Sequence, residues 1–305
     1  METRFVLVSD SSCDLPPELA ASQGVRVVPF YVSFDGKSYS REGVEIGVRD
    51  FYQKMVSDPA ARPRSSMPSV EDSRTVFEPL ARAGQPVLCL CITTKFSGSM
   101  QSALNAAELV RDDVPGAEIE VLDATVNTVL QGLLVMQAAA LRDRGVDLAA
   151  AIRRLVAIRE TGRIFFTIGD IAYLRAGGRI GKVAGIAGTL LGVKPVITLR
   201  QGEIFPSGLG RSRDKNIRRT IELVEEYYRE LGPRAARRYE LVIGYGYDRT
   251  EAERYREQLL SALQTDLGED YWPADRPKPA LWQIGAAIGV HTGPYPLGAA
   301  VLEQA

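Results

Sequence analysis

The 305-residue chain has little of what metal-binding, disulfide-linked or membrane-spanning proteins require. Its only histidine is His291, so a zinc site, which draws on histidine and cysteine ligands, is not expected. Its three cysteines, Cys13, Cys89 and Cys91, form no regularly spaced framework, which favours reduced thiols over a disulfide scaffold. No run reaches the roughly 18 consecutive apolar residues that a membrane-spanning helix needs.

The chain also has almost no net charge. The 37 basic and 38 acidic residues leave a net charge of −1, so no general field attracts nucleic acid or an anionic membrane. Residues 1–8 lack the basic stretch and long apolar run of a secretory signal. Together with the reduced thiols, these absences predict a cytoplasmic protein without stable membrane insertion, metal or cofactor.

The length fits two domains, and the first half predicts a parallel α/β fold. Short apolar runs alternate there with helical patterns, as in sheets covered on both faces. Ligands of such sheets bind beyond the carboxyl ends of the strands, where two polar clusters, 9–14 and 93–99, lie. The expected strands are 4–8, 25–33, 87–93 and 118–123, and the expected helices are 15–23, 99–111 and 127–144.

The second half predicts a more antiparallel sheet. Two of its strands are separated only by Gln201-Gly202, which indicates a tight hairpin. We therefore expect a parallel α/β domain over 1–160 and a second α/β domain, with a mainly antiparallel sheet, over 161–305. The expected strands are 163–168, 194–200, 203–206, 239–245, 280–285 and 299–302, with helices over 212–230 and 250–264.

Four clusters are candidates for a binding site. Hydroxyl-rich residues 64–69 end a long proline-containing loop, and residues 93–103 run from a strand end into a helix, where free N–H groups favour anions. A plain surface loop and a helix cap are the alternatives for these two. Residues 173–182 precede a helix-like run with Gly185, Gly188 and Gly192, but they fail the Walker A pattern because Val183 follows the lysine. His291 lies in a glycine-rich turn after an apolar strand.

The order of these clusters resembles that of the DegV family, which includes the FakB fatty-acid-binding proteins. The resemblance spans nearly the whole chain. It rests on six segments: Asp10–Leu15 (similar to DSxxDL), Ser65–Ser69 (TSQPS), Thr94–Ala103 (SxLSGTYQSA), Leu174–Ile180 (LxxGGRI), Lys194–Val196 (KPV or KPI) and His291–Pro294 (HxGPG).

The resemblance implies a non-catalytic protein that binds one long-chain fatty acid in a tunnel. The first domain would carry the carboxylate-binding hydroxyls and the second would cover the acyl chain. An ATP-dependent partner, the fatty acid kinase subunit FakA, would convert the presented carboxylate to an acyl phosphate. The residues that match the family's head-group positions are Ser65, Thr94 and His291, with Ser66, Ser97 and Gly98 nearby and Arg211 facing the head group or the kinase.

Two other classes of function stay open. A hydroxyl such as Ser65 with His291 as base suggests an acyl hydrolase, although no G-x-S-x-G elbow is present. A protein-interaction scaffold with an incidental lipid is the third class. Met67 and Tyr295 depart from the family pattern near the predicted pocket mouth, which bears on chain-length preference.

Overall fold

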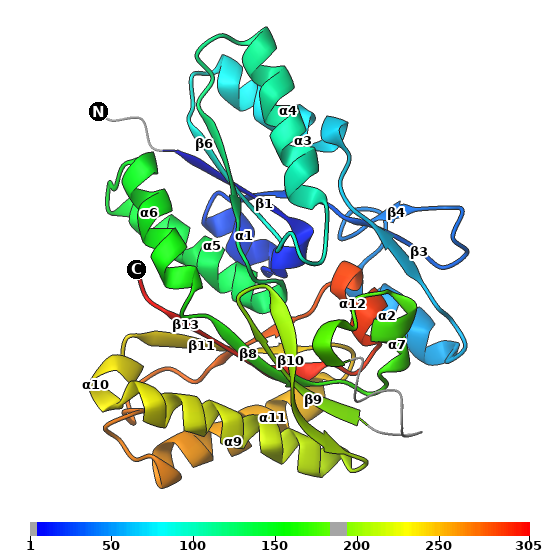
Figure 1. The fold of residues 1–305 in the computed structure, drawn as a ribbon, viewed down its shortest axis with the longest axis vertical. Helices are drawn as coiled ribbons and strands as arrows, with labels where there is room; N and C mark the ends of the chain where they lie inside the picture. The colour runs from blue at the N-terminus through cyan, green and yellow to red at the C-terminus, as the bar shows by residue number, and fades with distance from the viewer. Residues whose placement is uncertain (1–4, 184–193) are drawn as a thin grey trace.

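The computed structural model describes residues 5–183 and 194–305, and its first sheet is parallel (Figure 1). Four strands pair in the order β2-β1-β6-β7, and every pairing is parallel. This confirms the α/β arrangement predicted for the first half. The strands are β1 (Val6–Asp10), β2 (Arg26–Val28), β6 (Val87–Cys91) and β7 (Ile119–Asp123).

The single strand expected over 25–33 is wrong, because the chain changes sheet at Pro29. Proline has no N–H for a sheet ladder, so β2 ends before it. The following β3 (Tyr31–Ser33) joins a small antiparallel sheet with β4 (Ser40–Arg41) and β5 (Arg64–Ser66). Part of the predicted loop therefore forms β5, in which Ser65 is paired with Val32.

The second half forms a six-stranded sheet in the order β10-β9-β8-β13-β11-β12. All its pairings are antiparallel except that of β11 with β12, which confirms the mainly antiparallel sheet. The predicted hairpin turns at Gln201-Gly202. The strands are β8 (Arg163–Thr167), β9 (Lys194–Arg200), β10 (Glu203–Gly210), β11 (Tyr239–Tyr245), β12 (Ala280–Gln283) and β13 (Leu297–Glu303).

Helices cover both sheets (Figure 1). In the described ranges, no helix is both long and apolar enough to cross a lipid bilayer. The helix predicted around Gly185, Gly188 and Gly192 lies outside the described residues. The helices are η1 (Ser11–Cys13), α1 (Pro17–Ser22), α2 (Val48–Ser57), α3 (Val70–Arg82), α4 (Ser99–Asp113), α5 (Thr128–Asp143), α6 (Leu148–Arg159), α7 (Ala172–Ala176), η2 (Gly181–Val183), α9 (Arg213–Leu231), α10 (Pro233–Ala236), α11 (Arg249–Ser261), η3 (Ala262–Asp266) and α12 (Ala286–Thr292).

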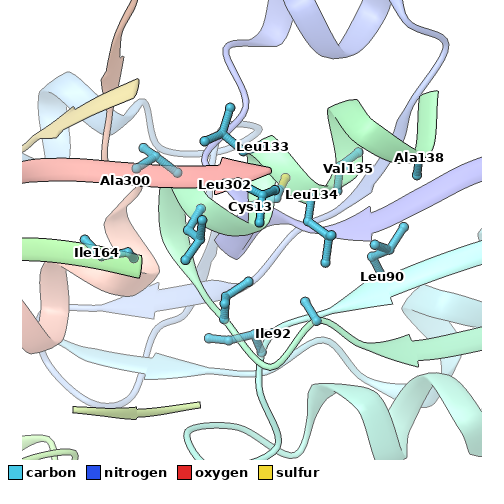
Figure 2. Close-up of a cluster of buried hydrophobic side chains, with 14 of the residues drawn as sticks. Cys13, Leu90, Ile92, Leu133, Leu134, Val135, Ala138, Ile164, Ala300 and Leu302 are labelled. Atoms are coloured by element: carbon cyan, nitrogen blue, oxygen red, sulfur yellow. The ribbon is translucent and has the colours of Figure 1, made fainter. Parts of the chain in front are cut away.

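Helix α5 lies between the two large sheets and joins them in one core. Most of its residues are buried, as expected of a helix that is apolar on all sides. In Figure 2 its Leu134 lies near Leu90 of the parallel sheet, with Leu302 of the six-stranded sheet on the other side. Because one hydrophobic cluster crosses residue 160, the proposed domain division there stays a prediction.

Candidate lipid-binding site

A cavity of about 280 Å³ lies where the two halves of the chain meet. Its volume is close to the lower end of the range of about 300–1,000 Å³ typical of small-molecule sites. Apolar side chains from strands β8 and β9, from helices α7 and α12 and from the segments that follow β2 and β6 form much of its wall: Phe166, Leu199, Leu174, Ile288, Phe30 and Ile92. The polar part of the wall contains Ser65, Ser66, Ser97, Arg179 and His291. Such a combination suits an elongated apolar ligand with one polar end.

The cavity continues into a smaller apolar space. This second cavity, of about 40 Å³, is lined by Ile164, Gly244 and Ile284 among others. It shares Asn127, Phe166, Ile288 and Thr292 with the main cavity. Neither Ser65 nor His291 lines this second cavity, although the shared Thr292 follows His291 in α12.

Ser65 and His291 meet in the wall of the cavity although 226 positions separate them. The Ser65 Oγ and His291 Nε2 atoms lie 3.1 Å apart, within hydrogen-bonding distance. Ser65 is held by the β3–β5 pairing, while His291 lies in the last turn of α12. The structure thus brings together two of the three residues predicted to contact a carboxylate.

The environment keeps His291 neutral. Burial, with a smaller contribution from the nearby Arg179 guanidinium, lowers the pKa of His291 to about 4. Its Nδ1 atom is buried and has no hydrogen-bond partner among the described residues. An unpaired acceptor is tolerated better than an unpaired donor, so we place the proton on Nε2, where it can be donated toward Ser65.

Gly177 leaves the space that the His291 ring occupies. A Cβ atom at this position would overlap His291 Nδ1. The backbone of Gly177 has a φ of −80°, which any residue adopts, so the close approach rather than the backbone conformation calls for glycine. Gly177 therefore acts on the cavity through the position of the imidazole.

His291 itself lies in a helix, not in the turn after a strand that the sequence predicted. Strand β12 ends at Gln283, and α12 begins at Ala286 after Gly285. The pattern AAIGVH contains two β-branched residues and a glycine, which local propensity reads as strand or turn. Tertiary contacts decide otherwise, since Glu42 Oε1 accepts a hydrogen bond from the backbone N–H of Ala287 in the first turn.

The loop between β6 and α4 supplies further lining residues. Ser97 and Gly98, both named as nearby candidates, face the cavity, as does Ser66 on the opposite segment. Met67 joins them, and a Cβ on Gly98 would press on its sulfur atom. Met67, which departs from the family's sequence pattern, is therefore part of the cavity wall. Tyr295, the other departure from that pattern, packs edge-on against Tyr247 outside the cavity.

Thr94 and Arg211 are not brought to the cavity. Thr94 is exposed, and its Oγ1 donates a hydrogen bond of 2.7 Å to Asp123 Oδ2 at the end of β7. Arg211 is exposed in the turn between β10 and α9, outside the cavity lining. The geometry therefore gives neither residue a contact with a ligand in this cavity.

A buried polar network supports the lining and joins the two polar clusters predicted at the strand ends, 9–14 and 93–99, through Gln131, which the sequence reasoning did not single out. Ser12, which faces the cavity, donates to Asp10 Oδ1, and the Gln131 amide donates to the same oxygen. The other Asp10 oxygen accepts from the Ile92 backbone and from the Ser99 hydroxyl. Burial raises the pKa of Asp10 despite these hydrogen bonds. The network ties the β1 loop to the β6–α4 loop.

A second buried acidic pair lies at the start of α12. Asp14 and Glu42 are 6% and 5% exposed, and both approach Gly285 closely. Glu42 accepts from the Ser11 hydroxyl, but Asp14 Oδ1 has no partner among the described residues. Burial raises the pKa of both carboxyls, and Glu42 raises that of Asp14 further.

Within the described ranges, no three His, Cys, Asp or Glu side chains are grouped so as to hold a metal ion.

The raised pKa values of Asp14 and Glu42 predict that the stability of the protein depends on pH. A carboxyl whose pKa is raised on folding binds more protons in the folded state, so the free energy of unfolding falls as pH rises from the unfolded pKa toward the folded one. We expect Glu42→Gln to remove part of this fall, so that the variant gains stability relative to the parent between pH 5 and 8. Urea unfolding across this range measures the difference. A constant difference at every pH would contradict it.

Comparisons with known proteins agree with the fold. Residues 4–304 match the family model described as "Uncharacterised protein, DegV family". A DegV domain-containing protein of Caldanaerobacter subterraneus is 30% identical over 295 residues, covering 97% of each chain.

Two solved structures carry ligand information. A stearic acid-binding protein from Eubacterium ventriosum is 41% identical, with a TM-score of 0.89 and 98% of each chain covered. A fatty-acid-binding DegV family protein from Thermus thermophilus is 30% identical, with a TM-score of 0.84 and coverage of 98% of this chain and 99% of that one. The chain belongs to the DegV family.

Proposed function

We propose that this protein binds one long-chain fatty acid in the cavity between its two halves, with the carboxylate at Ser65 and His291. The observation that carries the proposal is the Ser65–His291 pair, 3.1 Å apart, in the wall of an otherwise largely apolar cavity. The ligands of the Eubacterium ventriosum and Thermus thermophilus proteins, which share the fold, support the ligand class.

Neutral donors suit a buried carboxylate. With the His291 proton on Nε2 and donated to Ser65 Oγ, the Ser65 hydroxyl is free to donate its own proton to the ligand. Ser66 and Ser97 line the same cavity and provide further hydroxyl donors. Hydrogen bonds to a charged group offset the cost of removing the carboxylate from water, and none of these donors forms an ion pair that would neutralise it.

The acyl chain supplies most of the binding free energy. Burying about 15 methylene groups at roughly 0.8 kcal/mol each gives a gross gain near 12 kcal/mol. The loss of translational and conformational freedom offsets several kcal/mol of that gain. The apolar wall therefore determines affinity, while the head-group hydroxyls determine which end of the ligand lies at Ser65.

The placement of Ser65 and Thr94 leads to opposite predictions for their variants. We expect Ser65→Ala to weaken palmitate binding by about 10-fold to 100-fold, because it removes a hydrogen bond of about 1.5–3 kcal/mol to a charged group. Thr94→Ala should change the affinity by less than about twofold, because its hydroxyl is engaged by Asp123. Displacement of a fluorescent fatty acid measures both. A larger loss for Thr94→Ala than for Ser65→Ala would contradict the head-group assignment.

The ligand class is tested by mass spectrometry of an organic extract of the freshly purified protein. We expect a fatty acid in about equimolar amount. An extract without fatty acid, together with no binding of added palmitate, would refute the proposal.

We further propose that the bound carboxylate is presented to an ATP-dependent fatty acid kinase subunit. The chain has no Walker A sequence of its own, which is consistent with ATP being held by a partner. Formation of acyl phosphate from the purified lipid-loaded protein, ATP and a kinase subunit tests this step. The kinase subunit without this chain serves as the control.

The Ser65–His291 pair also raises the possibility of an acyl hydrolase. A serine nucleophile needs a base that a third group orients, yet His291 Nδ1 has no partner among the described residues. The lowered pKa, about 4, also makes His291 a weak base at neutral pH. Cleavage of 4-nitrophenyl palmitate that disappears in Ser65→Ala would favour the hydrolase.

A further inference from the structure

Four side chains mark the junction between the lipid cavity and the smaller apolar cavity, because they line both: Asn127, Phe166, Ile288 and Thr292. Ser65 lines the lipid cavity but not the smaller one. An acyl chain that begins with its carboxylate at Ser65 and continues into the smaller cavity therefore passes this junction. Two of the four side chains are apolar, as the methylene groups of such a chain require, but the other two are polar.

Asn127 is the unpaired polar group at the junction. In the part of the chain that the structure describes, neither the Oδ1 nor the Nδ2 atom of its side chain has a hydrogen-bond partner, and Oδ1 is buried. The Thr292 hydroxyl, by contrast, donates to the backbone carbonyl of Ile288. Because an unpaired buried amide is costly, its position in the wall of a ligand cavity points to a partner supplied by the ligand.

The Asn127 amide does not cap its own helix. Asn127 is the N-cap residue of α5, where an asparagine side chain commonly accepts a hydrogen bond from the first turn, yet this bond does not form. The next residue, Thr128, has a φ of 48°, which is unusual for a β-branched residue, and its hydroxyl donates to Asp14 Oδ2. The start of α5 is therefore held through Thr128, and the Asn127 amide remains available to a ligand.

A hydroxyl group on the acyl chain suits this amide better than a methylene group does. Methylene groups packed against Asn127 would shield the amide from water without replacing its hydrogen bonds. A hydroxyl both donates and accepts, so it can pair with either end of the amide, whereas a keto oxygen only accepts and cannot pair with Oδ1. Because the junction separates the two cavities, the hydroxyl belongs in the middle part of the chain.

We propose that the junction is a binding site for a hydroxyl group in the middle of an acyl chain, with Asn127 as its hydrogen-bond partner. This inference rests on the proposed function, since a carboxylate at Ser65 determines which part of the chain reaches Asn127. It deepens that function by adding a ligand class, the fatty acids with a mid-chain hydroxyl, to the unsubstituted fatty acids.

The test compares 10-hydroxystearate with stearate on the parent protein and on Asn127→Leu, which replaces the amide with an apolar side chain of similar size. We expect the parent to bind 10-hydroxystearate at least as tightly as stearate. Asn127→Leu should bind 10-hydroxystearate about tenfold more weakly, because the ligand hydroxyl loses its partner. The variant should bind stearate as tightly as the parent does, or more tightly. Isothermal titration measures all four affinities.

Two controls isolate the contact with the hydroxyl. The isomer 2-hydroxystearate carries its hydroxyl beside the carboxylate, so its affinity should be the same in the parent and in Asn127→Leu. Asn105→Leu makes the same substitution at an exposed position of α4 and should leave every affinity unchanged. Thermal unfolding shows whether Asn127→Leu has folded. If it has not, Asn127→Ala removes the same amide with a smaller side chain and takes its place in the comparison.

Equal changes in the affinities for stearate and 10-hydroxystearate, or no change in either, would overturn the inference, because the amide then pairs with something other than the ligand hydroxyl. A parent protein that binds stearate more than about tenfold more tightly than 10-hydroxystearate would also overturn it. The proposed fatty-acid function would stand in both cases. A parent protein that binds neither ligand would instead refute that function.

Discussion

Replacing Ala287 with phenylalanine should weaken fatty-acid binding more than a hundredfold while leaving the fold intact. Ala287 is 4% exposed and lines the cavity, so a phenyl ring there occupies space that the acyl chain needs. Excluding about four methylene groups at ~0.8 kcal/mol each costs about 3 kcal/mol, or more than a hundredfold in affinity. Isothermal titration with palmitate measures the loss.

The control for this prediction is Ala287→Ser, which leaves the cavity open and should bind palmitate within a few-fold of the parent. Thermal unfolding shows whether the phenylalanine variant has folded. If overpacking unfolds it, Ile288→Phe changes a neighbouring lining residue with a smaller increase in volume. Full palmitate affinity in a folded Ala287→Phe protein would place the lipid elsewhere.

Gly177→Ala should weaken binding about tenfold or more, although Gly177 forms no hydrogen bond to the ligand in our proposal. A Cβ there displaces the His291 imidazole, which breaks its hydrogen bond with Ser65. The loss of an oriented donor to a charged group corresponds to about 1.5–3 kcal/mol. Palmitate titration of the variant measures it.

A double-mutant cycle separates this mechanism from general destabilisation. If Gly177 acts through the imidazole, Gly177→Ala should have almost no further effect on affinity in a His291→Ala background, because the group that it displaces is gone. If the losses of palmitate affinity caused by Gly177→Ala and His291→Ala add up in the double variant, Gly177 acts by another route. The positioning of His291 would then not explain why position 177 is a glycine.

The elements of this fold were largely predictable from local patterns. Buried strands such as β1 and β6 are short apolar runs, and the β9–β10 hairpin is indicated by Gln201-Gly202. The strand over 25–33 was mispredicted because Pro29 moves the chain to another sheet. The helix α12 was mispredicted because its first turn is held by Glu42, 245 positions away from Ala287.

The sequence by itself determined the α/β class, the mainly antiparallel second sheet and, through its ordered motifs, the family. Those features depend on hydrophobic periodicity and on short segments that keep their character along the chain. Only the tertiary structure decided which hydroxyls face the cavity. Ser65 and Thr94 are equivalent as donors in the sequence, but β5 turns Ser65 toward His291 while Asp123 holds Thr94 outside. Such choices depend on contacts between residues far apart in the chain, which no local pattern contains.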